Sequence, residues 1–174
     1  NTMPAHRLAR IMGYVPQGHR ISFPFKVRDV VMTGRMPYIP AFSSPRREDL
    51  ERTEQALALT GIGGLADQPY TQISGGERQL VMIARAMAQQ PSVLLLDEPT
   101  SYLDFKNQIQ TLKMVKEISR SQGVTVVMTL HDPNHALMFS DEVVLLRKRN
   151  GSRVGNVIAF GPPHEVMTSQ NIKA

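Results

Sequence analysis

The stretch from Ile73 to Asp104 constrains the fold of this 174-residue chain more than any other part of it. It begins with Ser74-Gly75-Gly76 and continues from Glu77 to about Gln89 with apolar residues at the spacing of one helix face: Leu80, Ile83, Ala84 and Met87. The apolar run Val93–Leu96 then fits a strand buried on both faces of a sheet. Further alternation of strands and helices along the chain predicts an α/β layer structure.

Two neighbouring carboxylates, Asp97 and Glu98, follow this strand directly. Open parallel sheets bind ligands at the carboxyl ends of their strands, which is where the pair is expected. Mg²⁺ prefers oxygen ligands and keeps bound water, so one acid suits the metal and the second can hold an attacking water. An acidic strand exit is common by itself. Here it follows Ser74-Gly75-Gly76 at a helix start, where free N–H groups and glycines let a phosphate approach closely. The combination predicts phosphate chemistry.

Composition excludes some kinds of site. The chain has no cysteine, so it can form neither a disulfide nor a thiolate metal site. Its net charge of +5 and pI of about 9.8 suit phosphate ligands, nucleic acid or an anionic membrane face. The basic residues are scattered apart from Arg46-Arg47 and Arg147-Lys148-Arg149, and no aromatic residues interleave with them for base stacking. We therefore expect no nucleic-acid partner. No apolar run approaches the roughly 20 residues that span a bilayer.

The N-terminal half contains one expected strand followed by helices. Ile11–Val15 is predicted to be a strand that ends at Gln17. From residue 23 to 72 strand patterns are missing, and a helix is expected from Glu48 to Thr60, with Ser44-Pro45 as its cap and first turn. Charges four residues apart, Glu48–Arg52 and Arg47–Glu51, lie on its exposed side. An aromatic and apolar group in the preceding loop fits either a core under that loop or a docking surface: Tyr38, Ile39 and Phe42.

The C-terminal half continues the alternation. A helix after Asp104 has an apolar face made of Phe105, Ile109, Leu112, Val115 and Ile118, and it ends at Gly123. Val124–Leu130 is an apolar strand that we expect to bring His131 to the same sheet edge as the two acids.

Three further elements are expected after His131. A short helix begins at Pro133. A hairpin pairs Glu142–Leu146 with Val154–Phe160 through the turn signal Asn150-Gly151. A last short helix runs from Pro162 to Met167.

Two histidines need an alternative interpretation. His131 and His135 are four residues apart, a spacing that can place two imidazoles on one metal. However, Pro133 begins the helix after His131, so the pair does not share one regular helix face, and no third ligand is evident. Zinc is therefore not expected. His131 could also be a satisfied polar residue at a strand end.

Taken together, these motifs resemble those of the ATP-binding cassette (ABC) ATPases over nearly the whole chain. The matching segments are YVPQ around Gln17, ISGGE from Ile73, LLLDEPT around Asp97 and Glu98, and LHDPNHA around His131. The resemblance implies a partial P-loop NTPase (RecA-like) ABC core with an inserted helical subdomain and a C-terminal β-hairpin. The core would comprise residues 1–22 and 91–174, and the helical subdomain residues 23–90.

The resemblance also implies roles for single residues. Asp97 would position Mg²⁺ through water, Glu98 would act as general base, and His131 and Gln17 would sense the γ-phosphate, with Gln17 also reaching the metal. Residues of the glycine turn would bind the γ-phosphate of an ATP held by a second subunit, and Asp104 would couple the two sites. The turn residues are Ser74, Gly75, Gly76 and Glu77, of which Glu77 replaces the usual glutamine.

A narrower resemblance concerns transport. The segments VRDVVMTGRMPY and DEPTSYLDFKNQ resemble those of importers of iron–siderophore complexes, haem and vitamin B12. This implies a homodimer at the cytoplasmic face of the membrane, bound to integral membrane permease subunits and served by an extracytoplasmic binding protein. The rival interpretations are a non-transport ABC ATPase that acts on DNA or the ribosome, and a truncated, inactive cassette that serves as an interaction module.

One motif of the family is missing. The P-loop G-x-x-x-x-G-K-[ST] holds the β- and γ-phosphates, but this chain has no Gly-Lys dipeptide. Gly13 and Gly18 have the right spacing, yet His19-Arg20 follow them. In the family the P-loop precedes the segment of Gln17, so we expect that this chain lacks that N-terminal part. The polypeptide alone is then expected to bind ATP poorly or not at all.

Overall fold

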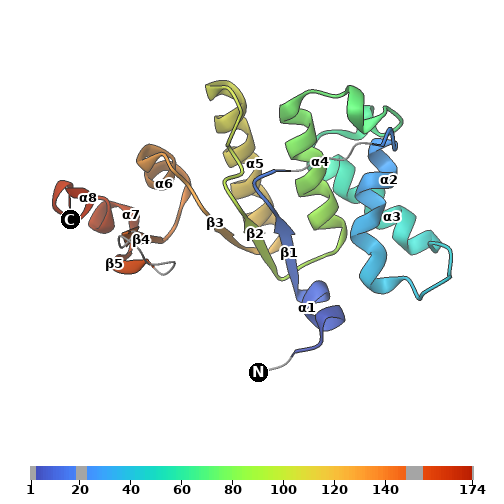
Figure 1. Ribbon diagram of the computed structural model, residues 1–174, viewed down its shortest axis with the longest axis horizontal. Helices are drawn as coiled ribbons and strands as arrows, with labels where there is room; N and C mark the ends of the chain where they lie inside the picture. The colour runs from blue at the N-terminus through green and yellow to red at the C-terminus, as the bar shows by residue number, and fades with distance from the viewer. Residues whose placement is uncertain (1–2, 19–22, 148–154, 174) are drawn as a thin grey trace. The chain divides into compact units, whose positions relative to one another are not determined.

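The computed structural model describes residues 3–18, 23–147 and 155–173 (Figure 1). The chain divides into two compact units, Asn1–Thr129 and Leu130–Ala174. No helix within the described ranges is long and apolar enough to cross a membrane.

A parallel sheet organises the first unit. Among the described residues it has three strands, β1 (Met12–Val15), β2 (Val93–Leu96) and β3 (Thr125–Met128), with β2 in the centre. The last residues of the strands, Val15, Leu96 and Met128, are in register. The predicted bounds of β2 are confirmed. β1 and β3 are shorter than predicted, because Ile11 ends helix α1 (Ala5–Ile11) and Val124 and Leu130 lie outside β3.

The two faces of the sheet differ in burial. Val15, Leu94 and Leu96 are buried in the main hydrophobic core, whereas Tyr14 and Val127 on the other face are 55% and 53% exposed. Strand β2 is therefore buried on one face and only half-buried on the other, where the sequence predicted burial on both. The difference arises because its neighbours on that second face, Tyr14 and Val127, are themselves open to solvent.

Three helices pack against one another on one side of β1 (Figure 1): α2 (Val27–Met32), α3 (Arg47–Leu59) and α4 (Gly75–Ala88). Short 3₁₀ helices connect them: η1 (Thr33–Tyr38), η2 (Gly63–Leu65) and η3 (Tyr70–Gln72). The expected apolar face of α4 is confirmed, since Ile83, Ala84 and Met87 are buried. Gly34 is required at the start of η1, because a Cβ there would clash with the backbone oxygen of Arg85 in α4.

A buried ion pair ties this helical group together. The guanidinium of Arg35 donates to the Asp49 carboxylate at 3.0 Å and to the backbone oxygen of Ala88 at 2.9 Å. The second Asp49 oxygen accepts the N–H of Arg46 at 2.9 Å, so α3 begins at Arg47 and the predicted Ser44-Pro45 cap is wrong. Burial raises the pKa of Asp49, but hydrogen bonds from Arg46 and Arg35 outweigh it and hold the pKa below its ordinary value.

The loop residues Tyr38, Ile39 and Phe42, which fitted either a core or a docking surface, differ from one another in burial. The guanidinium groups of Arg10 and Arg35 lie over the ring of Tyr38, 5.0 and 4.1 Å from its centroid, and the Tyr38 hydroxyl donates to the backbone oxygen of Gln89 at 2.9 Å. Tyr38 therefore holds the fold together, Ile39 is half-buried, and Phe42 is fully exposed. The predicted pairs Arg47–Glu51 and Glu48–Arg52 are both present, at 2.8 and 3.8 Å.

Helix α5 (Phe105–Gln122) completes the first unit. Its residues Leu112, Val115 and Ile118 are buried as predicted, and Gly123 ends it in the left-handed conformation at φ 64°. Phe105 is 73% exposed, so its predicted place on the buried face is wrong. It is the first residue of the helix, directly after Asp104, and it lies ahead of the turns that pack on the core.

The second unit contains α6 (Pro133–Phe139), an antiparallel hairpin of β4 (Val143–Arg147) and β5 (Asn156–Gly161), α7 (Pro163–Val166) and α8 (Ser169–Lys173). The hairpin is confirmed, with a register shift between Leu145 and Leu146. Its predicted turn at Asn150-Gly151 lies outside the described residues, as do Lys148-Arg149 and His19-Arg20. Helix α8 was not predicted from the sequence.

Candidate functional site

The ends of β1, β2 and β3 meet at one edge of the sheet. The N–H of Asp97 donates to the backbone oxygen of Val15 at 2.9 Å, and that of Thr129 donates to Leu96 at 3.0 Å. The parallel ladder thus continues one residue past the strands and places Asp97 and Thr129 side by side. The expected meeting of strand ends at this edge is confirmed for the first unit.

Glu98 is held by neighbours on two sides. The amide of Gln17, just beyond β1, donates to Oε2 of Glu98, and the hydroxyl of Ser101 donates to the same oxygen at 2.7 Å. The backbone of Glu98 is in the left-handed region at φ 47°, which turns the chain sharply away from β2. The structure therefore brings together Gln17 and Glu98, two of the predicted site residues that are far apart in the sequence.

Thr129 joins the two acids. Its hydroxyl donates to Oδ1 of Asp97 at 2.9 Å and accepts the N–H of Glu98 at 2.8 Å. Sequence reasoning missed this residue, although a hydroxyl directly after an apolar strand, in a parallel sheet with acids at the neighbouring strand end, was a usable signal. Ser101 was missed as well.

The glycine turn is the N-terminus of α4. Ser74 caps the helix through its hydroxyl, which accepts the N–H of Glu77 at 3.3 Å, and the Glu77 carboxylate accepts the N–H of Ser74 at 2.7 Å. This reciprocal pair is a capping box. Hydrogen bonding from the side chain and the backbone N–H of Ser74 holds the pKa of Glu77 below its ordinary value. Ser74 and Gly75 are exposed, as a turn that receives a ligand requires.

Asp104 caps the neighbouring helix α5. Its two carboxylate oxygens accept the backbone N–H and the side-chain amide of Asn107, both at 2.8 Å. The Asn107 amide in turn lies beside Gly76, at 3.7 Å from where a Cβ would be. Residues of both helices, among them Ser74, Glu77 and Asn107, line a cavity of about 350 Å³. The structure therefore places the start of α4 beside the start of α5, which Asp104 caps.

A side chain of α5 forms hydrogen bonds to the loop between Glu98 and Asp104. The side-chain amide of Gln108 donates to the backbone oxygens of Leu103 at 3.0 Å and Thr100 at 3.3 Å. Together with the Ser101 contact to Glu98, this fixes the path of the chain from the acids to Asp104. Gln108 is a third residue that sequence reasoning did not identify.

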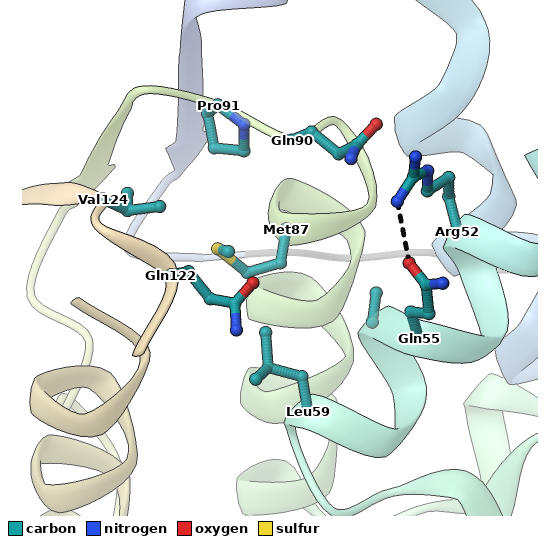
Figure 2. A pocket seen from close by; sticks show the side chains of 9 residues that line it. Arg52, Gln55, Leu59, Met87, Gln90, Pro91, Gln122 and Val124 are labelled. Carbon is teal, nitrogen blue, oxygen red and sulfur yellow. Dashed lines mark hydrogen bonds between the residues drawn. The ribbon is translucent and has the colours of Figure 1, made fainter. Parts of the chain in front are cut away.

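A second cavity of about 410 Å³ lies at the other end of α4 (Figure 2). In the close view Arg52 and Gln55 of α3, joined by a hydrogen bond of 3.1 Å, face Met87 and Gln122. Helix α4 separates this cavity from Ser74 by about 20 Å at the usual rise per residue. None of the predicted site residues lines it, so it lies apart from the predicted site.

His131 belongs to the second unit, so its role at the site stays a prediction. In that unit His135 is buried, with its ring near Phe139 and its Nε2 at 3.9 Å from Asp132. Throughout the ranges that the structure describes, no three histidine or acidic side chains form a group that could hold a metal.

Comparison with known proteins identifies related chains. A family model described as ABC transporter matches residues 2–101, which is more than half of the chain. The molybdate import ATP-binding protein MolC of Haemophilus influenzae is 38% identical over 163 residues, 94% of this chain and 62% of the relative. The ferric enterobactin transport ATP-binding protein FepC of Escherichia coli is 37% identical over 166 residues, 95% of this chain and 59% of the relative.

The fold has solved counterparts. A structure of a metal-chelate type ABC transporter in an inward-facing conformation matches with a TM-score of 0.86 at 37% identity, over 94% of this chain and 62% of that one. The chain spans less than two thirds of the length of each of these three proteins.

Proposed function

Because this chain belongs to the ABC transporter family, we propose that it is part of the ATP-hydrolysing subunit of an importer for a metal chelate such as an iron–siderophore complex, haem or cobalamin. One observation carries the proposal for the chemistry. Gln17, Asp97 and Glu98 lie at the ends of two adjacent parallel strands, although about 80 residues of sequence separate Gln17 from the acids. Gln17 donates a hydrogen bond to Glu98, and Thr129 links Glu98 to Asp97.

The two acids have different tasks in this proposal. Asp97 follows the central strand with a half-buried carboxylate, a donor that suits Mg²⁺, and it would hold the ion with Gln17 nearby. A magnesium ion held there would supply positive charge against the phosphate oxygens of ATP. Glu98 accepts a proton from water as the water oxygen attacks the γ-phosphorus and the bond to the ADP oxygen breaks. Gln17 and Ser101 fix the Glu98 carboxylate for that transfer.

The start of α4 serves a second ATP in this proposal. The exposed residues Ser74 and Gly75, together with Gly76, would present a helix N-terminus to the γ-phosphate of an ATP bound mainly by the other subunit of a homodimer. Glu77 caps the helix and so keeps its first turn formed. Asp104 lies close to this turn through Asn107, which supports the proposed coupling of the two sites. His131 would complete the contacts to the γ-phosphate.

The partners follow from the family. We propose that residues 23–90 form a helical subdomain that receives a membrane permease at the cytoplasmic face, with exposed Phe42 at the contact. An extracytoplasmic protein would deliver the cargo. The relatives carry names for both molybdate and ferric enterobactin transport, so similarity alone supports an importer, and the segments resembling metal-chelate importers favour the narrower class.

Hydrolysis needs a P-loop, which these 174 residues do not contain. The test therefore compares two proteins: the polypeptide of 174 residues and the product of the complete reading frame that includes it. We expect nucleotide binding and hydrolysis from the second and none from the first. In the second protein, Glu98→Gln should lower kcat at least about 100-fold, since general-base catalysis contributes on this scale.

The opposite results identify the rival functions. Full hydrolysis by Glu98→Gln would remove Glu98 from the role of general base. A complete reading frame that neither contains a P-loop nor hydrolyses ATP would indicate an inactive cassette that acts through its partners. Purification with ribosomes or DNA, and not with membrane permease subunits, would indicate a non-transport ABC ATPase.

A further inference from the structure

Thr129 occupies a position that no motif of the sequence analysis explains. It lies one residue beyond β3, and its N–H continues the ladder to Leu96. Its hydroxyl has one hydrogen to donate and lone pairs to accept, and it uses both, donating to Asp97 Oδ1 and accepting from the N–H of Glu98. A single side chain therefore contacts the proposed metal ligand and the backbone of the proposed general base.

The contact to Glu98 is made at a residue with an unfavourable backbone conformation. Glu98 has a left-handed backbone that non-glycine residues rarely adopt, so neighbouring contacts must hold it. Thr129 fixes its N–H, and the N–H of Ser101 donates to its carbonyl oxygen at 3.0 Å. With both ends of the residue fixed, the side chain of Glu98 is delivered to Gln17 and to the Ser101 hydroxyl.

The contact to Asp97 fixes a carboxylate that would otherwise rotate. Within the described residues the Thr129 hydroxyl is the donor to Asp97 Oδ1. Side chains that orient a metal ligand in this way tune both metal binding and activity.

We propose that Thr129 is a positioning residue of the hydrolytic site, which sets the orientation of Asp97 and the backbone of Glu98 together. This inference rests on the proposed function. In this proposal Thr129 affects the rate of hydrolysis by orienting Asp97 and Glu98, and it does not contact the reacting phosphate.

The test uses the product of the complete reading frame and three variants. Thr129→Val keeps the branched shape and removes both hydrogen bonds, while Thr129→Ser keeps the hydroxyl. Thr125→Val makes the same chemical change at the exposed first residue of β3. The backbone N–H of Thr125 donates to the backbone oxygen of Ser92, and the substitution leaves that hydrogen bond in place. Three quantities are measured: kcat for ATP hydrolysis, KM for ATP, and the hydrogen-exchange rate of the Glu98 amide by NMR in nucleotide-free protein.

We expect Thr129→Val to lower kcat by about 10- to 100-fold, the usual effect of losing an orienting partner. KM should change little, because substrate binding is not what is lost. The Glu98 amide should exchange faster than in the wild type. Thr129→Ser should restore kcat and the exchange rate, and Thr125→Val should leave both of these unchanged.

Three results would overturn the inference: wild-type kcat and exchange in Thr129→Val, an equal loss of kcat in Thr125→Val, or no recovery in Thr129→Ser. If Thr129→Val does not fold, the result for Thr129→Ser decides. This variant keeps the hydroxyl, so a loss of kcat and a rapid exchange of the Glu98 amide in it would contradict the proposed role of Thr129. If the wild type hydrolyses no ATP, the proposed function fails, and the exchange rate then decides the Thr129 bridge independently.

Discussion

At the scale of single residues, the structure explains why Glu77 can stand where the family motif usually has a glutamine. A carboxylate at this position adds negative charge beside a turn that is proposed to bind phosphate. In the structure that carboxylate accepts the N–H of Ser74 and lies at the positive end of α4, where a negative charge is favourable. Glu77 thus contributes to the helix cap, and Ser74 remains exposed for a ligand.

Replacing Glu77 tests this cap. Glu77→Ala should lower the free energy of unfolding by about 1 kcal/mol, the usual contribution of such a hydrogen bond. Glu77→Gln keeps an acceptor and should cost less. Chemical denaturation monitored by circular dichroism measures both. Equal stability of wild type and Glu77→Ala would show that the capping box contributes nothing.

The same cap gives a pH dependence. The pKa of Glu77 is lower in the folded protein than its ordinary value of 4.5, so its charge stabilises the folded state above that value. As the pH falls through the folded-state pKa, the carboxylate is protonated and this stabilisation is lost. The stability advantage of wild type over Glu77→Gln should therefore shrink below about pH 4.5. An advantage that stays constant on acidification would contradict the assignment.

At the scale of secondary-structure elements, the buried pair Arg35–Asp49 connects η1 to α3 and, through Ala88, to the end of α4. Charges removed from water in this way are costly to leave without a partner. The pair also holds Tyr38, whose ring lies on the Arg35 guanidinium. The helical group therefore depends on one polar cluster as well as on its apolar contacts.

Breaking this pair should be far more costly than breaking an exposed one. Arg35→Met leaves the Asp49 carboxylate buried without its partner and should lower the free energy of unfolding by about 3 kcal/mol or more. Arg47→Met removes the exposed pair with Glu51 and should cost less than about 1 kcal/mol. Urea unfolding of the two variants makes the comparison. Similar losses in both would show that burial does not set the importance of Arg35.

The elements that could be predicted from the sequence are those that local patterns define. The apolar run of β2, the amphipathic face of α4 and the Gly123 end of α5 all follow from neighbouring residues. The strand ends were predicted less accurately, because hydrogen bonds to a strand distant in the sequence decide where β1 and β3 begin and end. Arg35–Asp49 and Thr129–Asp97 were missed for a related reason: each depends on how elements distant in the sequence pack, which no local pattern reports.

At the scale of the whole molecule, the chain divides into a unit that contains the acids and the glycine turn and a second unit that contains His131. The sequence motifs predicted that all of them serve one site. The structure brings Gln17 into contact with Glu98, links Glu98 to Asp97 through Thr129, and places Ser74 and Asp104 at two neighbouring helix starts. The contribution of His131 remains a prediction, because it depends on how the second unit is held in the working protein.

The open face of the sheet has a practical consequence for handling the polypeptide of 174 residues. Tyr14 and Val127 present apolar surface beside Leu95, and such surface favours contact between copies. A net charge of +5 opposes that contact at low ionic strength, and added salt screens the repulsion. Sedimentation velocity should therefore detect self-association that increases with salt concentration, and Val127→Lys should reduce it. Storage in dilute buffer would then keep preparations monodisperse, whereas the high-salt washes common in purification would promote turbidity.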